Sequence, residues 1–231
     1  MNRLAIALGL TGLAFAGAAS AATYTITVED LVPGGPATGQ PLSPPVAAVH
    51  DGSYSLFAEG AAASPGLEIV ARDGTPTTLL MEAEAASGVS YATIGSAGPF
   101  FDSVQFTVEG EAGDLFSVAM MLGRTNDLIT GVHDIVLPSS DTVVLMTNAY
   151  DAGVEVNTGM IEHIPFYGNS GVGPDEDGVI TMIGSYTIFN DPDFGKLDFT
   201  FPPAARITIE PGNTTPVETT TWGAIKGLYA R

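Results

Sequence analysis

The sequence predicts an all-β domain, an antiparallel β-sandwich with short helical turns, and three observations support this class. Short runs that alternate apolar and polar residues recur along the chain, and a period of two is typical of half-buried strands. Clusters of Gly, Pro, Asn and Asp separate these runs. Helical patterns occur only in short pieces. Many short strands with frequent Gly and Pro punctuation favour a sandwich or a barrel.

Seven runs are predicted to be strands. In chain order they are residues 24–28, 77–81, 103–108, 115–122, 142–146, 179–183 and 205–209. The predicted turns between them are residues 33–36, 51–52, 73–74, 109–113, 174–178 and 190–192. One short helix is predicted over residues 67–71, because Ser64 is a suitable N-cap and Pro65 suits the first helical position.

The first residues predict export. A basic residue, Arg3, precedes an unbroken small and apolar run over residues 4–18, and Ala19-Ser20-Ala21 supplies a small-x-small cleavage pattern. The run is shorter than the roughly 20 strongly apolar residues of a membrane-spanning helix. We therefore expect residues 1–21 to be a cleaved bacterial signal peptide, and the protein to be periplasmic or secreted. No later stretch is apolar enough to predict a membrane span in the mature chain.

The mature chain is predicted to contain one domain and a tail. Residues 22–210 are long enough to bury a core without disulfides, and the chain contains no cysteine. Residues 211–231 are interpreted as a Thr- and Pro-rich linker with a short C-terminal tail that holds the only tryptophan, Trp222. This tail could dock the domain onto an envelope partner, or it could fold back onto the sandwich.

The charge balance excludes one class of partner and favours another. The chain carries 26 acidic and seven basic residues, so its net charge is −19. A surface this negative repels phosphate backbones and has no basic cluster to offset the repulsion, which argues against nucleic acid. The same field attracts cations, including divalent metals. The alternative is that the acidity only keeps an exported protein in solution.

Catalytic motifs are incomplete. Gly168-Asn169-Ser170-Gly171 resembles part of a serine-nucleophile loop, but Val172 interrupts the pattern. The three histidines lack the spacing of a catalytic zinc site. No pair of carboxylates stands out from the acidic background as a glycosidase pair. The sequence therefore predicts binding rather than catalysis, with a carboxylate-based hydrolase left as an alternative.

Two segments carry a resemblance when they are taken together. In residues 116–132 a strand leads into a polar turn that ends in Asp127, followed by an apolar pair and then Gly131-Val132. In residues 148–159 the chain reads Asn-Ala-Tyr-Asp-Ala-Gly-Val-Glu-Val-Asn-Thr-Gly. Their order and spacing resemble the spondin domain, the amino-terminal module of F-spondin and mindin that also occurs alone in bacterial exported proteins. The resemblance covers about residues 23–210.

The resemblance implies a β-sandwich with a calcium ion held among loops at one end. Carried over residue by residue, the implied ligands are Asp127, Asp151 and Glu155. Calcium takes six to eight oxygen ligands and tolerates irregular geometry. Two acids four residues apart on a straight strand would be roughly 13 Å from each other, too far for one ion. Ala152-Gly153 permits a turn that would bring Asp151 and Glu155 inward, with Asp127 joining them from another loop.

The sequence departs from the family pattern at two points of this site. Asn126-Asp127-Leu128 stands where the family has Pro-Asp-Trp, and Glu155 stands where the family has Asp. The alternative to a calcium site is that these acids cap loops, with Asp127 accepting N–H bonds within its own turn. We expect an exported, calcium-binding, adhesion-type module that recognises a protein or a glycan at the cell surface. A structural envelope component docked through its tail is the second hypothesis.

Overall fold

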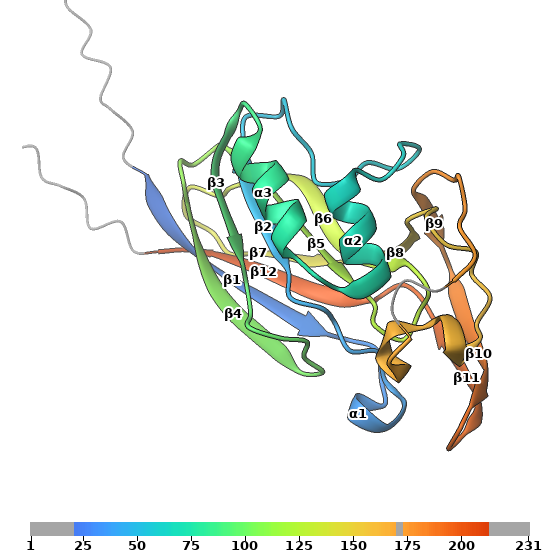
Figure 1. The fold of residues 1–231 in the computed structure, drawn as a ribbon. Helices are drawn as coiled ribbons and strands as arrows, with labels where there is room; N and C mark the ends of the chain where they lie inside the picture. The colour runs from blue at the N-terminus through green and yellow to red at the C-terminus, as the bar shows by residue number, and fades with distance from the viewer. Residues whose placement is uncertain (1–20, 170–172, 213–231) are drawn as a thin grey trace, which may run out of the picture.

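In the computed structural model, two antiparallel sheets pack face to face and a layer of helices covers one of them (Figure 1). The structure describes residues 21–169 and 173–212. The predicted signal peptide, apart from Ala21, and the tail beyond residue 212 lie outside the described residues. The strand pairing confirms the predicted antiparallel sandwich.

The first sheet has four strands. Their order is β4 (Ser103–Gly110), β1 (Ala22–Asp30), β12 (Ala205–Pro211) and β7 (Val143–Met146). Tyr24, Ile26 and Val28 of β1 are buried, while the threonines between them are half-buried. This alternation is what a strand with one face on the core requires. The predictions for residues 24–28, 103–108, 142–146 and 205–209 are confirmed.

The second sheet has six strands and a more deeply buried centre. Their order is β3 (Val89–Ile94), β2 (Val46–His50), β5 (Leu115–Met121), β6 (Leu128–Val136), β8 (Asn148–Asp151) and β9 (Thr181–Ile183). Phe116 and Val118 of β5 belong to the core between the two sheets, together with Ile207 of β12. Ala119 and Met121 of β5 face the helices instead. Both faces of this sheet are therefore covered.

Two nine-residue helices form the outer layer, α2 (Pro65–Asp73) and α3 (Thr77–Ala85). Ser64 caps α2 by accepting the backbone N–H of Leu67 at 3.2 Å, which confirms the predicted helix start. The strand predicted over residues 77–81 is wrong, because this segment opens α3. The apolar run is followed by Glu, Ala, Glu and Ala, which favour a helix, and Leu79 and Ala83 bury one side of it.

The remaining elements surround one end of the sandwich. They are α1 (Gly35–Thr38), the 3-10 turns η1 (Ile161–His163) and η2 (Pro165–Tyr167), and a separate hairpin of β10 (Ser185–Asp191) and β11 (Gly195–Thr200). At the other end, the start of β1 lies beside the end of β12, with Tyr24 opposite Pro211 (Figure 1). Within the described ranges, no helix has the length and apolar character needed to cross a bilayer.

Asp30 at the end of β1 should make stability depend on pH. Burial raises the pKa of Asp30 to about 7; the backbone N–H of Val32 opposes the rise and the charge of Asp102 adds to it. A raised folded-state pKa means that the folded protein binds the extra proton. The stability from Asp30 is therefore complete below about pH 4 and is lost as pH rises towards 7. In a chelating buffer, Asp30→Asn should show a smaller fall in melting temperature between pH 5 and pH 8 than the unchanged protein. Parallel curves for the two proteins would contradict this assignment.

Candidate metal centre

The two segments singled out in the sequence meet because β6 pairs with β8. Asp127 ends the turn between β5 and β6, and Asp151 is the last residue of β8. In the antiparallel register Leu128 lies opposite Asp151, and the N–H of Ala152 donates to the carbonyl of Asp127 at 3.3 Å. Asp127 and Asp151 are therefore neighbours at one end of the sheet, although 23 residues separate them along the chain.

Asp127 is fully buried and only one of its two carboxylate oxygens is bonded. Oδ2 accepts the backbone N–H groups of Val154 and Glu155 at 2.8 and 2.9 Å. Oδ1 is buried and has no hydrogen-bond partner among the described residues. Burial raises the pKa of Asp127 to about 7; the N–H of Glu155 opposes the rise, and the charge of Asp151 adds to it. At neutral pH this carboxylate needs a proton or a cation.

Asp151 and Asn157 add oxygen atoms to the same corner. Asp151 Oδ1 accepts the N–H of Gly153 at 2.9 Å, which closes the tight turn that Ala152-Gly153 was expected to allow. Gly153 has φ +68°, a left-handed conformation that suits glycine. Asp151 Oδ2 accepts from Asn157 Nδ2 at 2.6 Å, and the amide oxygen of Asn157 is buried without a partner in the described part of the chain. We refer to Asp127, Asp151, Glu155 and Asn157 as the loop edge.

Glu155 lies at the loop edge, but one oxygen of its carboxylate is paired with Arg72. The residue is fully buried, and Oε1 accepts from Arg72 Nη1 at 2.7 Å. Burial raises the pKa of Glu155, and the Arg72 guanidinium opposes the rise. Among residues 21–169 and 173–212, no three Asp, Glu or His side chains converge closely enough to hold one ion. The structure thus brings Asp127 and Asp151 together and turns the third predicted ligand towards Arg72.

The turn that carries Asp127 is held by Asn126 rather than by an aromatic residue at position 128. Tyr186 of β10 donates its hydroxyl to Asn126 Oδ1 at 2.5 Å, and the N–H of Gly159 donates to the same oxygen at 3.3 Å. Asn126 Nδ2 donates to the carbonyl of His163 at 3.2 Å. The buried side chain of Leu128 fills the core below. This satisfied network of hydrogen bonds makes the turn rigid without the tryptophan of the family pattern.

A model of the spondin N-terminal domain (Spondin_N) matches residues 33–162, which is more than half of the chain and includes both segments of the loop edge. The chain belongs to the spondin N-terminal domain family. A search of curated protein sequences finds none that matches the chain. The family model ends before β9, so the β10–β11 hairpin that supplies Tyr186 to the turn of this spondin domain lies outside the match.

The donor atoms of the spondin loop edge fit a hard cation such as calcium. All are oxygens, two of them belong to neighbouring carboxylates, and Asp127 Oδ1 and Asn157 Oδ1 are buried without hydrogen-bond partners in the described part of the chain. Calcium prefers this mixture of carboxylate and amide oxygens. Asp127 does cap a loop, as the alternative interpretation expected, but the loop is that of Val154 and Glu155 and not its own turn.

Three residues of this site were not found from the sequence: Arg72, Asn157 and Tyr186. Arg72 and Glu155 are 83 positions apart, and no local pattern links them. One signal was available. Arg72 is among only seven basic residues in the chain, and it directly follows the predicted helix over residues 67–71 in a strongly acidic protein. Such a residue is expected to have carboxylate partners.

Proposed function

We propose that this spondin domain is an exported binding module in which calcium at the loop edge fixes a recognition surface for a protein or a glycan. The observation that carries the proposal is the buried, unbonded Oδ1 of Asp127 beside Asp151. A fully buried carboxylate with one oxygen free and a second carboxylate next to it is costly unless a positive charge is added. The predicted signal peptide supports export.

Asp127 and Asp151 would hold the ion, with Asn157 completing the protein ligands. When bound, calcium would supply a divalent positive charge that offsets the two carboxylates and links the β5–β6 turn to the end of β8. Hydrogen bonds within the chain already orient both carboxylates. Two backbone N–H groups orient the carboxylate of Asp127, and the Gly153 turn orients that of Asp151. We expect calcium to stiffen loops that are already close to their final arrangement.

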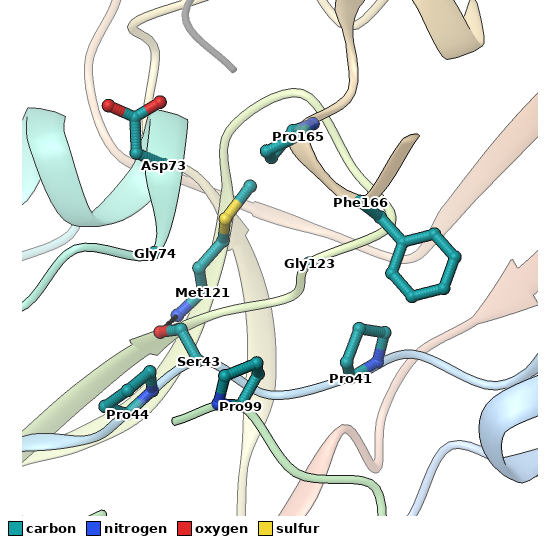
Figure 2. A pocket seen from close by; sticks show the side chains of 10 residues that line it. All are labelled: Pro41, Ser43, Pro44, Asp73, Gly74, Pro99, Met121, Gly123, Pro165 and Phe166. Atoms are coloured by element: carbon teal, nitrogen blue, oxygen red, sulfur yellow. Dashed lines mark hydrogen bonds between the residues drawn. The ribbon is translucent and has the colours of Figure 1, made fainter. Parts of the chain in front are cut away.

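The turn that carries Asp127 also borders a small apolar hollow (Figure 2). Gly123 of this turn lines it, and the Met121 side chain extends across it towards Pro165. Phe166 at its edge is 40% exposed. The cavity volume is about 180 Å³ and the lining is mostly apolar, with four prolines. This lining favours an apolar protein side chain over a sugar, and calcium at Asp127 would stabilise one wall of the hollow.

Calcium is expected to raise the melting temperature of the purified protein. At a calcium concentration 100 times the Kd, binding to the folded state adds about 2.7 kcal/mol, which corresponds to about 5 °C or more for a domain of this size. Asp151→Asn should abolish most of this rise, because it removes one of the two carboxylates but keeps an acceptor for the N–H of Gly153. Thermal shift and calorimetry with added calcium chloride, and then with chelator, measure both effects.

The matched control is Asp141→Asn, which removes one negative charge from an exposed residue away from the loop edge. It should keep the full calcium response. A melting temperature that is the same in millimolar calcium and in chelator would remove the metal from the proposal. An equal loss of response in Asp141→Asn would show that calcium acts on the overall charge and not at the loop edge.

A further inference from the structure

Arg72 lies in the last turn of α2 and holds three oxygen atoms of the chain beyond β8. Its Nη1 donates to Glu155 Oε1 at 2.7 Å, while Nη2 donates to the carbonyl of Val154 at 2.9 Å and to Asp175 Oδ1 at 2.7 Å. Glu155 and Asp175 also face each other across a β-bridge. The Arg72 guanidinium is thus an internal cation that joins α2 to the two segments that carry Glu155 and Asp175.

The backbone and the side chain of Glu155 make contacts in different parts of the structure. Its N–H donates to Asp127 Oδ2 at 2.9 Å, so the backbone lies against the loop edge. Oε1 of its carboxylate pairs with Arg72, where the Glu155 side chain is 1% exposed and that of Arg72 is 22% exposed. Glutamate is one methylene longer than aspartate, and this length supplies the reach to the helix. A buried carboxylate in this position needs a positive partner, and Arg72 provides it.

We infer that Arg72 competes with calcium for Glu155 and thereby sets the calcium affinity of the loop edge. While Arg72 holds Glu155, the ion has two carboxylates; once Arg72 releases it, Glu155 becomes the third. Calcium affinity in protein sites rises with the number of charged ligands, and a nearby guanidinium repels a second cation. The inference rests on the proposed function, because it concerns the same site.

The test is the calcium Kd of Arg72→Gln, measured by calorimetry on the purified protein. We expect the Kd to fall about tenfold, because Glu155 is released as a third carboxylate and a repelling charge is removed. The double variant Arg72→Gln with Glu155→Gln should lose the part of this gain that the third carboxylate supplies, and keep only the smaller part that comes from removing the guanidinium charge. Glu155→Gln alone should change the Kd by less than about twofold, because Arg72 already withholds that carboxylate.

Arg206→Gln is the matched control. Arg206 also pairs with a carboxylate, that of Glu29, but on the other sheet. The control therefore changes the net charge by the same amount and should leave the Kd within about twofold of the unchanged protein, since distant charges are largely screened by salt. A gain in Arg206→Gln equal to that of Arg72→Gln would overturn the inference, because total charge would then explain both results.

The outcomes separate the inference from the proposed function. Binding by the unchanged protein and tighter binding by Arg72→Gln support both. Binding that appears only in Arg72→Gln supports the competition and rejects calcium as a ligand of the natural chain. Binding that is equal or weaker in Arg72→Gln overturns the competition alone, and no binding in either protein overturns both.

Arg72→Lys covers the case in which Arg72→Gln does not fold. Lysine keeps the positive charge and the packing of α2, but a single ammonium lacks the two nitrogens that Arg72 uses towards Glu155 and Asp175. Its weaker hold on Glu155 should lower the calcium Kd by a smaller factor than Arg72→Gln. An unchanged or higher Kd in Arg72→Lys would overturn the inference.

Discussion

Replacing Gly131 by alanine is expected to destabilise the domain by about 3 kcal/mol or more, the upper range for steric overpacking of a buried site. Gly131 lies in β6 between its partners Ala119 of β5 and Asn148 of β8. A Cβ built at this position would lie 1.9 Å from the carbonyl oxygen of Val118, and backbone on that side cannot rotate away as a flexible side chain could. The centre of the six-stranded sheet would have to separate locally. Urea unfolding at equilibrium measures the loss.

Gly184→Ala is the control for Gly131→Ala. Gly184 is exposed between β9 and β10, and a Cβ there would meet nothing within 4 Å. Its unfolding free energy should stay within about 0.5 kcal/mol of the unchanged protein. If the two glycine variants were equally stable, the strands around Gly131 would not be packed as closely as the structure shows.

Asp127→Ala and Asp127→Asn are expected to separate the two roles of this residue. Alanine leaves the buried N–H groups of Val154 and Glu155 without an acceptor, which should cost about 3 kcal/mol at about 1–3 kcal/mol for each donor. Asparagine keeps an acceptor oxygen, removes the buried charge and places an amide beside Asp151. In chelator at pH 7.5, Asp127→Asn should therefore be at least as stable as the unchanged protein. Both variants should lose the calcium response.

Urea unfolding in chelator and in millimolar calcium chloride distinguishes these roles, with Asp141→Asn again as the exposed control. An Asp127→Asn protein that calcium still stabilises fully would contradict the metal role of Asp127. An Asp127→Asn protein as unstable in chelator as Asp127→Ala would show that the charge, and not the acceptor, holds the loop of Val154 and Glu155.

The strands that sequence patterns predicted best are those with one face on the core. In β1 and β12, buried and less buried side chains alternate, so the period of two is visible in the residues themselves. All five residues of β2 are buried, because sheet covers one side and helices the other. Val-Ala-Ala-Val-His shows no alternation, and this strand was not predicted. Where helices cover the second face of a sheet, its strands are buried on both faces and lose the alternation of apolar and polar residues on which strand prediction depends.

The helix α3 was mistaken for a strand because its first five residues have a strand-like composition. Thr77-Thr78-Leu79-Leu80-Met81 has the β-branched and apolar composition of a short strand. Its conformation is set by residues 82–85, which are good helix formers, and by packing of Leu79 and Ala83 against the sheet. Five residues were too short a window to show a period of 3.6.

The loop edge could be predicted only in part. The family resemblance located Asp127 and Asp151, and the Gly153 turn between Asp151 and Glu155 was expected from the ability of glycine to adopt a left-handed conformation. The direction of the Glu155 side chain could not be predicted, because it depends on a helix 83 residues earlier in the chain. Side-chain length and a distant guanidinium together decide where the carboxylate of Glu155 lies.

The start of β1 and the end of β12 lie side by side, and their position has a practical consequence for how the domain could be attached to a surface. Tyr24 donates its hydroxyl to the carbonyl of Pro138, just beyond the end of β6, whereas Asp127 and Leu128 lie at the start of the same strand. The length of β6, roughly 27 Å for its nine residues, separates them. A cell-wall anchor, a fusion partner or a biosensor chip joined near Ala22 or Pro211 would therefore leave the loop edge at the far end of the domain, facing away from the attachment point.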